Sequence, residues 1–482
     1  MKLIYDIVKK LRKQEIRQIR QKIKNSPFEY EKMGKLFDLV TRYDEREEEF
    51  YSQKLYGKLP DNTFRVTKSR LKRMLENIVL NDKSLTGYKS PAINARLQVQ
   101  KKLLQGEILL GRGAYLASKN LLLQVISTAE KYSFHNEYFQ AELLLYRNHS
   151  IRISVKEFEK KTDTLLKTNH LRASINEAMI LYYSISNLLF NQAVKPEQRA
   201  RIREQIDKIK AISDDSGHSQ IKKRYFLSEI YFLQISNLHK EALEFCHKYL
   251  RLIQEDRSQY SEQEIAVAYG QLAQVYLRLG ELDEAQNYAN QALDIFSKEE
   301  MNYLTGLELP FHIAFEGGNY RDAMKYIKKA FKHPQFEASR MLASKWHYFH
   351  ACILFKTGDF KEAYMKLNDT TPLLADKYGM NLSLRLLEIM IMFELQHYDL
   401  METKILNMRQ FIKRTQKNQE LMRPITLIKV LIKWYKNNYD FAKTLEITRS
   451  ELEKMEESVR KSSMRNDKFE LIRLEEWMRE KV

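Results

Sequence analysis

Apolar residues recur every three or four positions along most of this chain, which is the spacing of amphipathic α-helices. The alternation of apolar and polar residues that marks β-strands is scarce, and the 482 residues include only eight prolines and fourteen glycines. The pattern therefore predicts an all-α protein. Because no run of about 18 apolar residues occurs, we expect no membrane span.

One helix pair is complete between residues 264 and 296, in the stretch EIAVAYGQLAQVYLRLGELDEAQNYANQALDIF. Bulky residues such as Tyr269 and Tyr276 alternate with small ones such as Ala285 and Ala289, and Gly280 falls at the turn, where a left-handed backbone costs glycine little. This order resembles the tetratricopeptide repeat (TPR). The resemblance implies a right-handed α-solenoid of TPR-like helix hairpins, preceded by a small helical N-terminal domain.

The same turn signal recurs on both sides of this pair. Aligned turns fall at Asn237, Gly280, Gly318, Gly358 and Gln396, which are separated by 43, 38, 40 and 38 residues. These intervals exceed the usual period of the family, so we expect longer helices or loops. A degenerate upstream copy is expected to turn at residue 113.

Four regions follow from these signals. We expect a basic helical N-terminal domain at 1–90, degenerate hairpins at 95–212, the TPR array at 221–440 and capping helices at 441–482. Within the second region, 138–168 and 171–212 are interpreted as separate hairpins, and the polar stretch 212–220 as a loop. The cap is expected to use Phe469, Leu474 and Trp477, because a solenoid needs a polar-faced end.

The formal net charge is +18, and it is unevenly distributed. Residues 1–100 hold 23 Lys and Arg against 13 Asp and Glu, whereas residues 251–300 hold 4 against 10. Basic blocks are typical either of solvated helix surfaces or of surfaces for nucleic acid and acidic partners. Two isolated cysteines and the lack of an apolar leader predict a cytoplasmic protein. Nothing in the sequence fixes the oligomeric state.

The N-terminal region is predicted to begin with a basic amphipathic helix at 1–24, which either packs on the next helix or lies on an anionic membrane. Three helices should follow, the last starting at an N-cap residue, Asp61. This third helix carries five basic residues: Arg65, Lys68, Arg70, Lys72 and Arg73. It is loosely similar to the recognition helix of winged-helix regulators, but residues 81–95 show no strand alternation for a wing. Both a helical docking domain and a nucleic-acid contact remain open.

The TPR resemblance also implies which residues face the concave groove, where a protein or peptide partner would bind. These candidates are Tyr231, Gln234, Gln274, Arg278, His312, Phe315, Tyr348, Phe355, Lys356 and Phe393. Three of them, Phe315, Phe355 and Phe393, occupy equivalent positions in successive repeats. This file of aromatics either anchors an apolar or helical peptide or fills the space between adjacent first helices.

The basic and amide clamp with which some family members hold acidic chaperone tails is absent, so this partner is not expected. The sequence has no HExxH metal motif, no phosphate loop and no calcium loop, and we expect no cofactor, no metal and no catalysis. The predicted function is a non-enzymatic scaffold or adaptor that uses the TPR groove. The alternative is a TPR-containing regulator that binds nucleic acid through the basic N-terminal domain.

Overall fold

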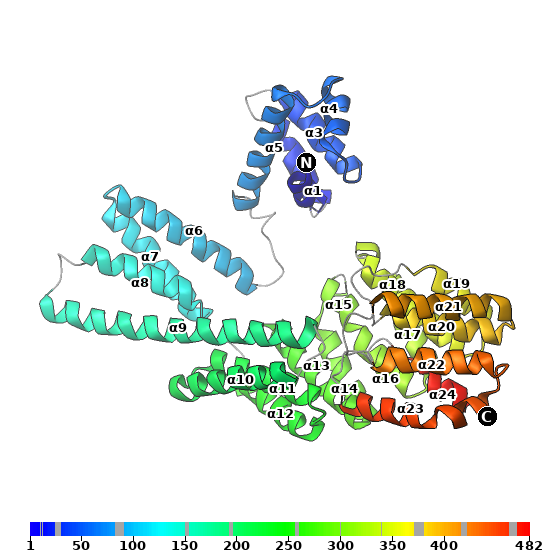
Figure 1. Ribbon diagram of the computed structural model, residues 1–482. Helices are drawn as coiled ribbons and strands as arrows, with labels where there is room; N and C mark the ends of the chain where they lie inside the picture. Colours follow the sequence, from blue (N-terminus) through cyan, green and yellow to red (C-terminus); the bar gives the residue numbers. More distant parts are fainter. Residues whose placement is uncertain are drawn as a thin grey trace. The chain divides into compact units, whose positions relative to one another are not determined.

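The fold is given by a computed structural model that describes residues 1–9, 11, 13–24, 30–81, 91–149, 154–191, 196–255, 260–298, 300–338, 340–370, 380–415, 422–461 and 470–482. All regular elements in these ranges are helices (Figure 1). The chain divides into two compact units, Met1–Val155 and Lys156–Val482.

The first unit begins with five helices: α1 (Lys2–Lys9), α2 (Lys13–Lys24), α3 (Tyr30–Arg42), α4 (Glu48–Tyr56) and α5 (Asn62–Asn81). The three helices expected after the first are confirmed as α3, α4 and α5. The expected single helix at 1–24 was wrong, because it divides into α1 and α2. Its apolar stripe packs inside the protein, where Ile4, Val8 and Ile19 join a core with Phe37 and Phe64.

A left-handed glycine and an N-cap residue define the connection between α4 and α5. Gly57 adopts a left-handed backbone with φ of 69° and ends α4, and the Asp61 carboxylate accepts a hydrogen bond from the backbone N–H of Phe64 at 2.9 Å. The predicted N-cap is thus confirmed. Glu48 on α4 binds both the N-terminal ammonium group and Lys68 of α5, at 3.0 and 2.6 Å.

Three more helices complete the first unit: α6 (Pro91–Gly111), α7 (Tyr115–Lys131) and α8 (His135–His149). The predicted turn at Gly113 is confirmed by its φ of 76°. A second left-handed turn, at Ser133, had no glycine or asparagine to signal it. Arg96 of α6 reaches the buried Glu137 of α8 at 2.8 Å and ties the two helices together.

The second unit is built from helix pairs in sequence. Its helices are α9 (Val155–Asn191), α10 (Pro196–Ser216), α11 (Ser219–Ile235), α12 (His239–Glu255), α13 (Glu262–Leu279), α14 (Leu282–Ile295), α15 (Met301–Gly306), α16 (Glu308–Glu316), α17 (Tyr320–Phe331), α18 (Arg340–Lys356), α19 (Phe360–Asn368), α20 (Met380–Glu394), α21 (Tyr398–Thr415), α22 (Met422–Lys436), α23 (Phe441–Lys461) and α24 (Leu474–Arg479).

The turns of these pairs lie where the sequence predicts them. All five aligned positions have positive φ: 56° at Asn237, 81° at Gly280, 72° at Gly318, 82° at Gly358 and 59° at Gln396. A sixth pair, α22 and α23, turns through Asn438 and Tyr439 and was missed. The hairpins are TPR-like, and the second unit is an α-solenoid.

Two expectations about the start of this unit were wrong. No break separates residues 168 and 171, because α9 is one helix of 37 residues. The sequence there has neither glycine nor proline, and Thr162, Thr164 and Thr168 donate their hydroxyls to the carbonyl four residues back, so nothing interrupts the helix. The polar stretch 212–220 is mostly helical as well, since α10 extends to residue 216 and α11 starts at residue 219.

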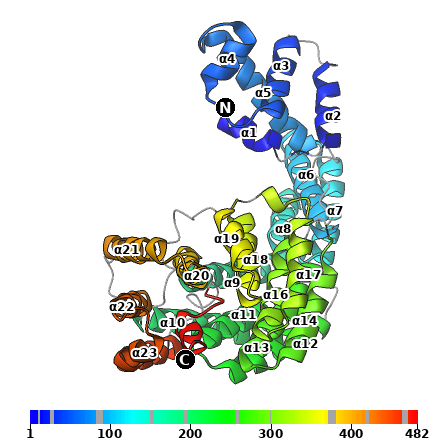
Figure 2. The ribbon, with the colours of Figure 1, turned by 90° about the vertical axis from the view of Figure 1, so that its right-hand side faces the viewer.

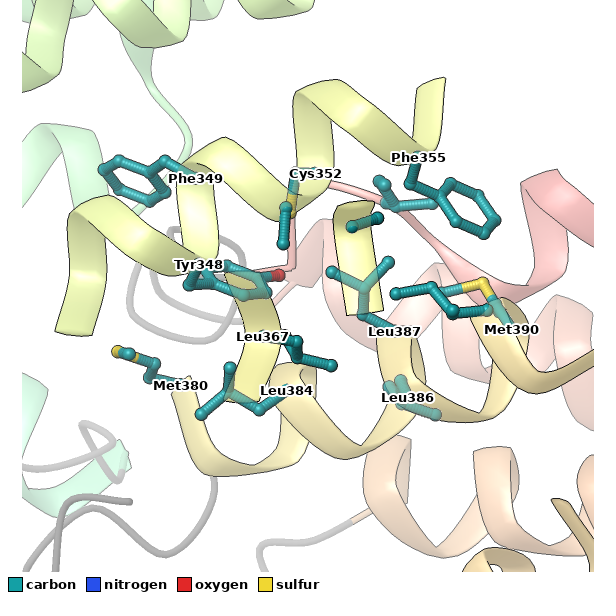
Figure 3. Packing of buried hydrophobic residues seen from close by; sticks show 14 of the residues in the cluster. Tyr348, Phe349, Cys352, Phe355, Leu367, Met380, Leu384, Leu386, Leu387 and Met390 are labelled. Carbon is teal, nitrogen blue, oxygen red and sulfur yellow. The ribbon is translucent and has the colours of Figure 1, made fainter. Parts of the chain in front are cut away.

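The largest core of the solenoid runs from α14 to α24. Figure 3 shows part of it, where Tyr348, Cys352 and Phe355 of α18 face Leu387 and Met390 of α20. Second helices α12, α14 and α17 lie outside first helices α11, α16 and α18 in Figure 2, so the first helices line the inner side of the curve.

The C-terminal segment, residues 470–482, returns to this inner side. It contains the short α24, and Leu474, Trp477 and Met478 are buried in the same core as α20, α22 and α23. Figure 2 shows α24 enclosed by the curve of the array. Phe469, which the sequence also assigned to the cap, lies outside the described residues.

Candidate functional site

A cleft of about 680 Å³ lies along the inner side of the solenoid. One wall is formed by α13, α14, α15 and α16 and by Phe296 after α14, with one residue each from α17 and α18. The other wall comes from the C-terminal segment, through Glu470, Leu471, Arg473 and Glu476. The cleft therefore combines residues that are far apart in the sequence.

Helix α13 supplies two of the polar groups of the first wall, Gln274 and Arg278. The helix starts in a capping box between Ser261 and Glu264, and Glu264 also pairs with the buried Lys223 of α11, which ties α13 to α11. Four residues of α13 that follow one another at intervals of four lie on one face of the helix and line the cleft: Ala266, Gly270, Gln274 and Arg278. The small residues leave room above the helix, and the two long polar side chains border that room.

Both members of the ion pair between Lys223 of α11 and Glu264 of α13 have shifted pKa values. Burial raises the pKa of Glu264, but the Lys223 ammonium group and hydrogen bonds from Ser261 outweigh burial and hold this pKa below its usual range. Burial lowers the pKa of Lys223. This pair is internal and supports α13 rather than lining the cleft.

Gln274 and Arg278 differ from the other charged and amide groups of the cleft in their partners. Among the described residues, neither of the two side chains has a hydrogen bond or an ion pair within the molecule. By contrast Glu308 is held by Lys345 at 2.7 Å, and Lys356 by Glu480 at 2.9 Å. An unpaired guanidinium group and an unpaired amide, four residues apart on one face, can both donate to a ligand.

The apolar part of the cleft comes from three helices. Leu277 of α13, Leu293 of α14 and Leu309 of α16 line it, together with the small residues Ala289 and Gly306. Gly306 is the last residue of α15. A Cβ at this position would meet Leu293 Cδ1 of α14 at 3.1 Å, so glycine permits the close approach of α15 to α14. The cleft is thus lined by both apolar and polar side chains.

The structure places five of the ten predicted groove residues on this cleft: Gln274, Arg278, His312, Phe315 and Lys356. The other five, Tyr231, Gln234, Tyr348, Phe355 and Phe393, do not line it. Sequence reasoning missed Glu470, Arg473 and Glu476, because no repeat pattern relates the C-terminal segment to α13.

The expectation that Gln234, Phe315, Tyr348 and Phe355 are exposed in the groove was wrong. Phe315 borders the cleft but is only 5% exposed. Gln234 is 2% exposed and donates its amide to Gln271 of α13 at 3.0 Å. Tyr348 is 1% exposed, and burial holds its pKa well above the usual value. Phe355 is 5% exposed. Tyr231 lies with its ring centroid 6.5 Å from that of Tyr182 on α9.

Each phenylalanine of the aromatic file has a packing partner within its own repeat, and Phe393 also contacts Trp434 of the next pair. Each phenylalanine meets, edge to face, the aromatic residue five positions later, across the turn. The centroid separations are 5.4 Å for Phe315 and Tyr320, 5.4 Å for Phe355 and Phe360, and 5.8 Å for Phe393 and Tyr398. These contacts close each hairpin, a packing role within the repeat rather than the expected one between adjacent first helices.

The basic helix α5 forms a separate candidate surface in the first unit. Phe64, Leu71 and Leu75 are buried, and Arg65, Arg70 and Arg73 are exposed. Lys68 is paired with Glu48 and Lys72 with Glu76, at 2.6 and 3.6 Å. Residues 82–90, where a wing would start, lie outside the described residues.

Catalytic chemistry finds little support in the described part of the chain. No group of three or more His, Cys, Asp or Glu side chains there could hold a metal ion. Both cysteines are buried, and burial raises the pKa of the Cys246 thiol to about 12 and also raises that of Cys352, so neither supplies a thiolate near neutral pH. No helix in the described ranges is long and apolar enough to cross a bilayer.

Comparisons with known proteins agree with this architecture. A family model described as 26S proteasome subunit RPN7 matches residues 234–383, from the end of α11 to the start of α20. No curated protein matches the chain.

Three solved structures illustrate the structural likeness. A human IFIT1 dimer with m7Gppp-AAAA has 14% identity, 99% coverage of both chains and a TM-score of 0.39. BtubC from P. vanneervenii has 14% identity, covers 46% of this chain and 92% of its own, and gives 0.39. A signal transduction ATPase with a tetratricopeptide repeat sensor from Pyrococcus horikoshii has 14% identity, covers 80% and 60%, and gives 0.38. At these values no function carries over from them.

Proposed function

We propose that this protein is a non-enzymatic scaffold or adaptor that binds a peptide segment of a partner protein in the cleft between α13, α16 and the C-terminal segment. The observation that carries the proposal is the pair Gln274 and Arg278, which line the cleft without partners among the described residues. A guanidinium group without a carboxylate attracts one, and a side-chain amide can bond a peptide backbone.

The surroundings of the pair favour a peptide over a small molecule. The cleft is lined by apolar side chains such as Leu277 and Leu309 beside polar groups, which suits the alternate side chains of an extended segment. The match of residues 234–383 to a proteasome-subunit family supports a role in protein assembly. We therefore expect a segment with at least one acidic residue, placed beside Arg278, and with apolar residues placed beside Leu277 and Leu309.

Site-specific photo-crosslinking tests this proposal. A benzoyl-phenylalanine residue at Leu309 should form covalent adducts with one protein in the native cell extract, because this position lines the cleft. The same residue at Arg321, which is exposed on the second helix α17, serves as the control. Adducts from position 309 that disappear in the Arg278→Ala background support the proposal, and equal adducts from both positions contradict it.

A second candidate function rests on α5, because Arg65, Arg70 and Arg73 are exposed on a helix whose other side is buried. Such a helix can bind the phosphates of a nucleic acid, and removing one arginine that binds a phosphate should reduce the log-log salt slope of binding by about one unit. Binding of duplex DNA or RNA by the full chain, compared with an Arg65→Ala/Arg73→Ala variant, tests it. An unchanged slope rules out α5 as the binding helix.

A further inference from the structure

The C-terminal segment occupies the inner side of the solenoid as a bound peptide would. Residues 470–473 precede the six-residue helix α24, and the segment meets the first helices α18, α20 and α22. Its apolar residues Ile472, Leu474, Trp477 and Met478 are buried, whereas its last four residues are exposed.

The first anchor of the segment is a buried cation. Arg423 of α22 is 8% exposed and binds Glu470, with Nε 2.7 Å from Oε2, and Glu475, with Nη1 3.0 Å from Oε1. Both carboxylates that hold this guanidinium group belong to the segment. Without them the solenoid would present a buried positive charge, which is costly unless other carboxylates replace them.

The second anchor is the indole ring of Trp477. Its centroid lies 5.6 Å from those of Phe393 and Trp434 and 5.5 Å from that of Phe441, in edge-to-face contacts. Its N–H donates to Glu394 of α20 at 2.8 Å. The receiving site is thus an aromatic cage with one acceptor at its edge, which selects for a tryptophan.

Ion pairs at the rim complete the interface. Lys356 of α18 meets Glu480 at 2.9 Å, and Lys481 meets Glu394 at 2.6 Å. Pairs of this kind at a partly exposed rim contribute orientation more than affinity. The two buried anchors therefore define what this part of the groove recognises.

We propose that residues 470–482 are an internal ligand of the distal groove formed by α18, α20, α22 and α23. The partner that this distal groove takes is a peptide with two carboxylates five residues apart and a tryptophan two residues after the second. Such a peptide exchanges with the internal segment. The inference deepens the proposed function, since it names the partner chemistry for the neighbouring part of the same concave face.

A synthetic peptide with the sequence ELIRLEEWMREKV, labelled with a fluorophore, tests the exchange on the full-length protein. In a chain carrying Glu470→Gln, Glu475→Gln and Trp477→Ala, the internal competitor is weakened, so the peptide should bind at least tenfold more tightly than it binds the wild-type chain. A peptide with alanine in place of its tryptophan should bind at least tenfold more weakly. Equal binding to both chains, or no binding to a triple variant that keeps its circular dichroism spectrum, overturns the inference.

Hydrogen exchange of the wild-type chain supplies a test that needs no variant. If the segment exchanges, the amides of α24 should exchange faster than those of α20 and α22, because the segment opens without the helices beneath it. Simultaneous exchange of α24 with α20 overturns the proposal. The labelled peptide reports on the distal groove, whereas photo-crosslinking from position 309 reports on the cleft beside α13, so failure of that cleft as a partner site is distinguishable from failure of this inference.

Discussion

Trp477, five residues from the C-terminal residue of the chain, donates its indole N–H to Glu394, the last residue of α20, across 83 positions of sequence. The bond joins the C-terminal segment to the inner side of the repeat array, and the ring is buried among Phe393, Trp434 and Phe441. This hydrogen bond anchors the segment in the groove.

The contribution of the Trp477 side chain can be measured by substitution. Trp477→Ala removes a buried aromatic side chain and should lower the free energy of unfolding by about 3–5 kcal/mol. Trp477→Phe keeps an aromatic ring and removes the hydrogen bond, so we expect a decrease of about 1 kcal/mol. Urea unfolding gives both values. The exposed Val482→Ala is the matched control, and a decrease as large as that of Trp477→Ala at this control contradicts the account.

The turn residues permit a reciprocal test of backbone conformation. Gly358→Ala places a Cβ at a φ of 82° and should cost about 1–2 kcal/mol. Gln396→Gly relieves the same constraint at a φ of 59° and should stabilise by about 0.5–1 kcal/mol. Gly270→Ala, inside α13 with no atom within 4 Å of its added Cβ, is a control that should also stabilise. The melting temperature of each variant decides, and a decrease on Gln396→Gly speaks against the assigned turn.

Phe355 should matter for folding and only indirectly for binding. Because its ring packs on Phe360 across the turn, Phe355→Ala should lower the free energy of unfolding by about 3–5 kcal/mol. Met365→Ala, on an exposed position of α19, should change it by less than about 0.5 kcal/mol. Chemical denaturation checks the difference. A Phe355→Ala chain of unchanged stability would return this residue to the candidate binding surface.

Local signals in the sequence predict the turns and helix pairs but only part of the cleft. The five aligned turns were predictable because a left-handed residue is a local requirement, met by Gly, Asn or a strained Gln within one short stretch. The helix pairs followed from periodicity for the same reason. The cleft could be predicted only in part, because Gln274 and Arg278 belong to a repeat but Glu470, Arg473 and Glu476 do not. Whether a groove position is open or covered depends on long-range interactions such as that of the C-terminal segment with α20, which no local pattern encodes.

His350 makes the stability of the repeat array sensitive to acid. Burial first, then the positive charges of Lys366 and Lys328 and the neighbouring His347, lower its pKa from 6.5 to about 4. The unfolded chain therefore binds a proton near pH 6.5 and the folded chain does not, so stability is complete above pH 6.5 and falls between about pH 6.5 and 4. The decrease in the free energy of unfolding should stay below about 3 kcal/mol, the value that the full shift corresponds to, because solvent screens the partly exposed ring.

Thermal unfolding between pH 7 and pH 4 measures this decrease. His350→Gln should flatten the part of the curve below pH 6.5, because the substituted side chain does not titrate. A curve that keeps its slope in the variant assigns the acid sensitivity to other groups, among them His347, whose pKa burial also lowers.

The central claim is that the concave cleft holds a partner peptide through Gln274 and Arg278. Once the partner is identified from its adduct at position 309, the dissociation constant of its crosslinked segment can be measured by titration calorimetry. We expect the Gln274→Ala/Arg278→Ala chain to bind at least tenfold more weakly than wild type, and the Arg321→Ala control to bind within twofold of it. Equal affinity in all three chains would contradict the claim.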